Sequence, residues 1–125
     1  MPATYFINTK GKPDKLCVYD WELSKIHIPQ HDLVEFLMFA LQPGSFTRKD
    51  VEYWIDFYRE QLETASGINL DCDMWRMGFI ACVKEYSLFR FGLYIMIHAV
   101  SPFGFVERVF KVSSELLAMF ADEKQ

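Results

Sequence analysis

Two pairs of side chains in this sequence are of types that could perform metal or thiol chemistry. His27 and His31 are four residues apart, a spacing of zinc ligands on one helix, but Pro29 between them places the pair at a strand-to-helix junction. Cys82 and His98 would form a thiol–imidazole pair if their segments were antiparallel neighbours, but no third group orients the imidazole. The sequence has no glycine-rich phosphate loop, GxSxG or HExxH motif. We therefore expect a protein that is not an enzyme, with no catalytic residue, metal site or cofactor.

Arg90 is the single residue that most suggests a ligand, because it stands between Phe89 and Phe91 in an apolar run. A guanidinium in such a place must pair, stack on a ring or reach solvent. A structural ion pair with Glu85 or Glu107 is one interpretation. The other is a small-molecule-binding domain in which Arg90 holds an anionic ligand. The pocket predicted by this second hypothesis is lined by Tyr86, Arg90, Tyr94 and His98.

A stronger signal comes from an amphipathic helix that begins after Thr47 and ends at Gly67. Thr47 is a typical N-cap with Asp50 three residues later, and Gly67 is a typical C-terminal stop. Five residues at helical spacing form the expected core stripe: Val51, Trp54, Ile55, Tyr58 and Leu62. Acidic and aromatic residues on the other side form the predicted partner-binding surface: Glu52, Tyr53, Asp56, Phe57, Glu60 and Glu63.

The charge distribution supports a protein partner. The formal net charge is −4, and the segment from Asp20 to Asp73 holds eleven acidic against four basic residues. This balance argues against nucleic-acid binding, which needs clustered Lys and Arg. The leading hypothesis is therefore a non-enzymatic interaction protein that binds another macromolecule through the acidic and aromatic surface. By composition alone the chain is similar to small acidic immunity or inhibitor proteins.

Location and self-association follow from the cysteines and the apolar runs. Cys17, Cys72 and Cys82 form no CxxC motif, and no signal-like segment opens the chain, so we expect a cytoplasmic protein with reduced thiols. The uncharged run from Phe91 to Val100 is too short to cross a bilayer, and we expect no membrane association. A third hypothesis is a homo-oligomeric structural or accessory protein, most simply a homodimer, because the expected helices carry more apolar surface than one small domain needs.

The elements that would position these residues begin with a β-rich segment. The stretches from Thr4 to Asn8 and from Leu16 to Trp21 have strand composition, and Ile26 to Ile28 could add a third short strand. Because a small meander is unstable alone, we expect it to pack one face on helices. The predicted fold is α+β, with a small N-terminal antiparallel β-meander packed on four or five helices in a single domain of residues 1–125.

The predicted helices after the meander have unequal support. One runs from Gln30 to Leu41, the next follows Thr47, and a third begins near Met74, capped by Asp71 or Asp73. The last runs from Pro102 to about Asp122. The run from Leu88 to Val100 is either a helix or a further strand, because periodicity does not decide for so apolar a segment. Read as a helix, it has one narrow and more polar stripe, formed by Ser87, Arg90, Phe91, Tyr94, His98 and Ser101.

Overall fold

The computed structural model describes the backbone of residues 3–7, 15–19 and 26–123 and the side chains of residues 26–123. Strands β1 (Ala3–Ile7) and β2 (Lys15–Tyr19) pair antiparallel, with Ala3 opposite Tyr19 and Ile7 opposite Lys15. Among the described elements these two strands pack substantially only on each other, while the other packing contacts join helices. Residues 26–28, predicted as a third strand, have no regular secondary structure.

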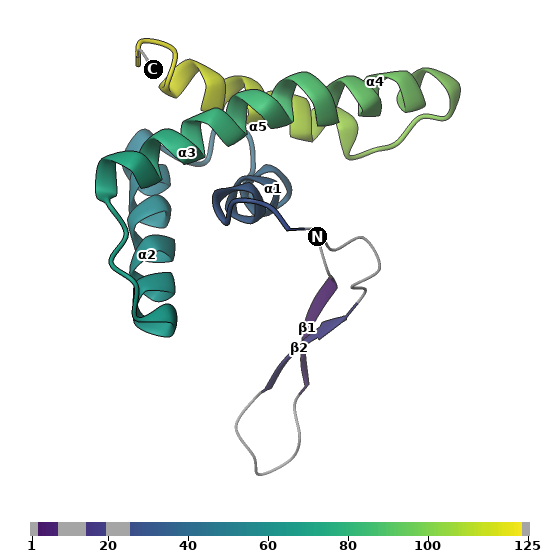
Figure 1. Cartoon of the computed structure of the whole chain (residues 1–125). Helices are drawn as coiled ribbons and strands as arrows, with labels where there is room; N and C mark the ends of the chain where they lie inside the picture. The colour runs from purple at the N-terminus through teal and green to yellow at the C-terminus, as the bar shows by residue number, and fades with distance from the viewer. Residues whose placement is uncertain (1–2, 8–14, 20–25, 124–125) are drawn as a thin grey trace.

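The rest of the described chain is helical. The helices are α1 (Gln30–Ala40), α2 (Arg48–Ser66), α3 (Cys72–Glu85), the π-helical turn η2 (Tyr86–Arg90), α4 (Phe91–Val100) and α5 (Val106–Met119). Because α3, η2 and α4 follow one another without a break, the described residues form four helical rods. The longest rod runs the width of the molecule in Figure 1, with α4 projecting at one end and α2 lying below the other.

The predicted α+β fold is wrong, because the part of the chain that forms a core is all-helical. The prediction rested on the need of a small meander for a helical cover. The helices instead bury their apolar faces against one another, with α1 packed on α3 and α5, and α2 packed on α3. Among the side chains of residues 26–123, the largest fully buried ones come from helices or from the residue that follows α5; they include Val34, Leu37, Val51, Ile55, Phe79, Val83, Val109, Leu116 and Phe120.

The alternative strand from Leu88 to Val100 is also wrong, since this segment is helical throughout. Its many Ile and aromatic residues have strand propensity, but continuation of the α3 hydrogen-bonding pattern decides the local structure. The last helix begins at Val106 and not at Pro102, and Ser101 is an extended residue that ends α4. Asp71, one of the two predicted caps of α3, accepts a hydrogen bond from the Met74 amide at 2.8 Å.

The ends of α2 are formed as predicted. Thr47 and Asp50 make the reciprocal hydrogen bonds of a capping box. The Thr47 hydroxyl and then the Thr47 amide donate to the Asp50 carboxyl and lower its pKa. Gly67 ends the helix in the left-handed conformation with a φ of 70°, where a side chain would be strained. The expected core stripe is wrong at Trp54, which is exposed, while Val51 and Ile55 are buried.

Candidate functional site

Three aromatic side chains lie together on the outer face of α2. Tyr53, Trp54 and Phe57 are 39–59% exposed, and their ring centroids are 5.3–6.0 Å apart. Tyr53 stacks on Phe57, and the Trp54 ring meets both edge-on. We call these three residues the α2 aromatic cluster. The sequence analysis did not predict this cluster, because it assigned Trp54 to the core stripe. It did assign Tyr53 and Phe57 to the predicted partner-binding surface.

The predicted acidic residues around the α2 aromatic cluster divide into two groups. Asp56 and Glu60 are exposed, and Glu60 lies 3.8 Å from the Arg59 guanidinium. Glu63 pairs with Arg59 at 2.9 Å and accepts a hydrogen bond from the Leu70 amide, so it holds the end of α2 to the loop that follows. The free carboxylates beside the cluster are therefore fewer than the sequence indicated.

Glu52, the remaining acidic residue of the predicted surface, belongs to a structural network. Arg76 on α3 donates two hydrogen bonds to Glu52, at 2.5 and 3.1 Å, and also pairs with Glu123 beyond α5. The guanidinium groups of Arg48 and Arg76 lie over the Phe120 ring, 5.3 and 5.5 Å from its centroid. Arg76 lowers the pKa of the Glu123 carboxyl by hydrogen bonding. This network joins α2, α3 and the C-terminal segment and so positions α2.

Each residue of the predicted Arg90 pocket makes a contact within the described part of the chain. Arg90 pairs with the buried Glu35 of α1, 3.6 Å away, and not with Glu85 or Glu107. Tyr86 is buried, and its hydroxyl donates to that of Tyr94 at 3.5 Å. Burial, followed by this hydrogen bond, raises the pKa of the Tyr86 phenol. His98 Nδ1 accepts a hydrogen bond from the Phe103 amide at 2.9 Å and so closes the loop after α4.

Of the two side-chain pairs that the sequence suggested for metal or thiol chemistry, one is far apart in the structure and the other is in contact. Cys82 and His98 lie on the same unbroken rod, so their sixteen-residue separation places them about 24 Å apart along it. Burial also raises the pKa of the Cys82 thiol to about 11, which keeps it protonated at neutral pH. The rings of His27 and His31 lie 4.4 Å apart, and His27 Nε2 is 3.9 Å from a Glu85 oxygen. Within residues 26–123, no group of three side chains is arranged to hold a metal ion.

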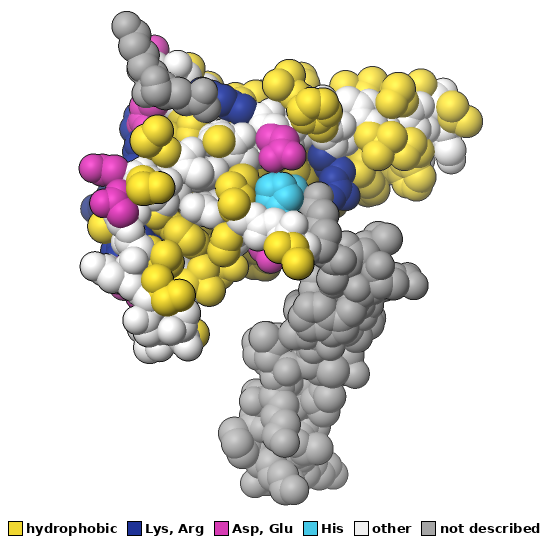
Figure 2. Space-filling view, viewed as in Figure 1, with side chains coloured by type: hydrophobic (Ala, Val, Ile, Leu, Met, Phe, Trp, Pro, Cys, Tyr) yellow, Lys and Arg dark blue, Asp and Glu magenta, His cyan; other side chains and the backbone are white. Residues whose placement is uncertain are grey.

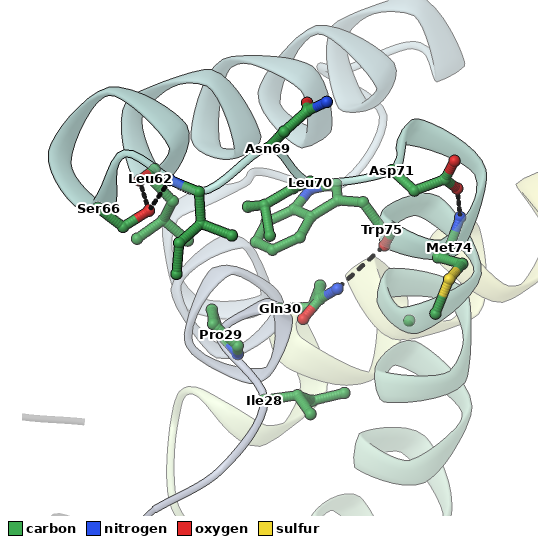
Figure 3. A pocket seen from close by; sticks show the side chains of 12 residues that line it. Ile28, Pro29, Gln30, Leu62, Ser66, Asn69, Leu70, Asp71, Met74 and Trp75 are labelled. Atoms are coloured by element: carbon green, nitrogen blue, oxygen red, sulfur yellow. Dashed lines mark hydrogen bonds between the residues drawn. The ribbon is translucent and has the colours of Figure 1, made fainter.

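A groove that sequence reasoning missed lies between α2, α3 and the start of α1 (Figure 3). Its volume is about 730 Å³. Its lining is mainly apolar and consists of Ile28, Pro29, Gln30, Leu62, Ser66, Ile68, Asn69, Leu70, Asp71, Met74, Trp75 and Gly78. None of the residues of the predicted Arg90 pocket lines this groove. Hydrophobic periodicity in the sequence could not predict this groove, because its walls come from the ends of three helices and from the loop before α3.

Gln30 is the buried polar group of this groove. Its Nε2 donates to the Trp75 carbonyl at 3.2 Å, while its Oε1 is buried without a hydrogen-bond partner. In Figure 3 this oxygen is turned away from Trp75. Gly78 makes the arrangement possible, because a Cβ there would lie 2.6 Å from Gln30 Nε2. A buried carbonyl oxygen that accepts no hydrogen bond lowers the stability of the folded state. The position of the Gln30 side-chain amide is therefore destabilising for the protein.

Comparisons with known proteins give no family for this chain: no family model, no curated protein and no solved structure matches it. In the part of the chain that the structure describes, no helix is both long and apolar enough to cross a membrane.

Proposed function

We propose that this is a non-enzymatic, cytoplasmic interaction protein that binds another protein through the outer face of α2. The α2 aromatic cluster is the observation that supports this proposal. Three large rings are held in mutual contact on the side of α2 that faces away from the core. Aromatic side chains dominate the energetics of protein interfaces, and rings that already pack on one another lose little conformational freedom on binding.

The helix that presents the cluster is well anchored. Its capping box fixes the first turn, and Trp75 Nε1 donates to the Ile55 carbonyl at 3.0 Å on the buried side. The Arg76 network holds the same helix through Glu52. A surface on so well-fixed an element binds with a small ordering cost.

Charge on this face defines the partner. Asp56 and Glu60 are exposed beside the α2 aromatic cluster, and the cation between them in the sequence, Arg59, has a side chain only 13% exposed that pairs with Glu63. Lys and Arg side chains bind both to carboxylates and to aromatic faces. The partner is therefore a protein that presents basic side chains around an apolar groove.

Site-specific photo-crosslinking in cells tests the proposal. A photoreactive phenylalanine analogue at position 57 should capture a specific partner, whereas the same analogue at Met77, exposed on α3, should not. With the partner purified, Phe57→Ala should weaken binding at least tenfold, because central aromatic residues are typical hot spots. Asp56→Lys with Glu60→Lys should slow association at low salt. Equal capture from positions 57 and 77, or unchanged affinity of Phe57→Ala, would contradict the proposal.

The groove supports a second candidate function, the binding of a small molecule. The volume of the groove lies within the range of ligand pockets. The Oε1 of Gln30 accepts no hydrogen bond within the protein, so a ligand with a donor group would satisfy it. No Lys or Arg lines it, and the one carboxylate, Asp71, caps α3. The hypothesis of a small-molecule-binding domain is therefore based on this groove and not on Arg90. The expected ligand is no longer an anion but an uncharged, mainly apolar molecule with one N–H or O–H group.

A matched pair of probes tests the second candidate. Indole and benzofuran have nearly the same shape, but only indole has an N–H donor. Indole should bind several-fold more tightly to the wild type, which corresponds to about 1 kcal/mol for one hydrogen bond. Gln30→Met, which removes the acceptor and keeps the length of the side chain, should abolish the preference, as measured by NMR titration. Equal binding of the two probes to the wild type, or no saturable binding, would reject this function.

A further inference from the structure

The projecting end of the long helical rod carries a large exposed apolar surface. We call this part, residues 88–103, the α4 arm. In Figure 1 it extends beyond α1 and α2, and in Figure 2 hydrophobic side chains cover the projecting end on the face shown. Eight large apolar side chains of the arm are 40–88% exposed: Leu88, Phe89, Leu93, Ile95, Met96, Ile97, Val100 and Phe103. Phe110 of α5 extends this surface toward the body and is half exposed.

The α4 arm is an amphipathic helix whose polar side faces the protein body and whose apolar side faces outward, the opposite of the usual orientation. Most of the narrow polar stripe predicted for this helix faces the body of the protein: Ser87 Oγ lies 2.6 Å from Ser113 Oγ, and Arg90 pairs with Glu35. The Tyr94 ring packs edge-on against Phe105. The apolar side of the helix consequently faces outward. Helices of soluble domains place the apolar side toward the core, so this arrangement indicates that something covers the arm.

The distribution of charged residues on and around the arm indicates which kind of partner could bury its apolar face. The segment from Phe91 to Phe105 contains no Asp, Glu, Lys or Arg. Three cations near its base are engaged within the chain: Arg90 pairs with Glu35, Arg108 donates to the Phe39 and Leu41 carbonyls, and Lys111 pairs with Glu107. Lys84, one turn before Leu88, is a single cation and not a row. A helix that lies on anionic lipid typically has a row of free cations, and the arm lacks one. A charged partner would find no counter-charge here, whereas a second uncharged arm meets no repulsion.

The size and shape of the arm also fit a copy of itself. Side chains of this number and exposure amount to about the 800 Å² that each partner contributes to a standard interface. Gly92 and Ala99 are two helical turns apart on the outward side, and a Cβ on Gly92 would meet nothing within 4 Å. Small residues with this spacing let two helices approach closely.

We propose that the protein forms a homodimer in which the apolar face of the α4 arm packs antiparallel on the same face of a second copy. Such an interface is two-fold symmetric, so Met96, midway between Gly92 and Val100, lies near its own counterpart. The interface leaves the outer face of α2 free, since α2 lies at the other end of the rod (Figure 1). The inference therefore does not depend on the function proposed for the α2 aromatic cluster.

Sedimentation equilibrium of the full chain at micromolar concentrations tests the proposal. The wild type should be a dimer, and Ile95→Glu with Met96→Glu should raise the dissociation constant at least a hundredfold, because each substitution would bury a carboxylate in the interface. Both residues are exposed in a single chain, so circular dichroism of the variant should stay unchanged. Met77→Glu, also exposed but away from the arm, is the matched control and should remain a dimer.

A crosslink adds a measurement of orientation. Met96→Cys in a background with Cys17→Ser and Cys72→Ser should form a disulfide between two copies on mild oxidation, whereas Met77→Cys in the same background should not. A monomeric wild type, or a dimer that persists in the Ile95 and Met96 variant, would overturn the proposal. A monomer that binds phosphatidylcholine–phosphatidylglycerol vesicles only when the arm is unsubstituted would overturn it in favour of a lipid surface.

Discussion

Replacing Phe79 with alanine is expected to lower the free energy of unfolding by about 3–5 kcal/mol, the largest effect of any single substitution proposed for this chain. The Phe79 side chain is fully buried on α3, and its ring meets the Phe120 ring edge-on with centroids 5.9 Å apart. Removing it takes away apolar burial and leaves a cavity where α3 meets the residue that follows α5. Urea denaturation at one fixed protein concentration measures the effect, since any association also contributes to stability.

Met77 provides the control for this prediction on the same helix. It is two residues from Phe79 but exposed, so Met77→Ala should change the free energy of unfolding by less than about 0.5 kcal/mol. If the two variants were equally stable, the assignment of α3 to the centre of the core would be wrong. A large loss for Phe79→Ala alone supports the helical core that replaced the predicted α+β arrangement.

The sequence predicted best those features that depend on neighbouring residues. The capping box of Thr47 and Asp50, the stop at Gly67 and the cap at Asp71 follow from hydrogen bonds and backbone angles within four residues. Each of these predictions needed no knowledge of what lies across the fold.

Features that depend on packing between distant segments could not be predicted. The partner of Arg90 is Glu35, on a helix more than fifty residues earlier, and no local pattern selects it over Glu85 or Glu107. Trp54 matched the core periodicity of α2, but only the position of α3 decides which side of that stripe is covered. The groove at Gln30 likewise exists only because α2, α3 and the start of α1 meet there.

The α4 arm shows how a pattern can be correct and its usual meaning wrong. Its polar stripe was identified from helical spacing, and the ordinary inference is that a polar stripe faces water. In the structure most of that stripe faces the body, through Ser87, Arg90 and Tyr94. Because of this reversal, the apolar run forms an exposed surface and not a core element. That outcome follows only once the elements that pack against α4 are known.

The second large effect is expected from Arg76→Met. The substitution leaves the carboxylates of Glu52 and Glu123 without the guanidinium that joins them, and it removes the cation over the Phe120 ring. We expect a loss of about 1–2 kcal/mol at pH 7, less than for a fully buried ion pair, because these side chains are a quarter to a third exposed to screening solvent. Lys111→Met removes an exposed cation that pairs with Glu107 on the same helix, and solvent screening should make its loss of stability much smaller than that of Arg76→Met.

The pH dependence of this loss identifies its origin. Hydrogen bonding to Arg76 lowers the pKa of Glu123 in the folded protein, so ionised Glu123 contributes stability above the ordinary glutamate pKa. That contribution disappears as the pH falls through the lowered pKa, because the protonated carboxyl no longer pairs with Arg76. The stability difference between wild type and Arg76→Met, measured by urea denaturation from pH 7 to pH 3, should therefore shrink toward low pH. A difference that stays constant over this range would mean that Arg76 acts by packing on Phe120, and that the ion pairs with Glu52 and Glu123 do not hold α2 in place.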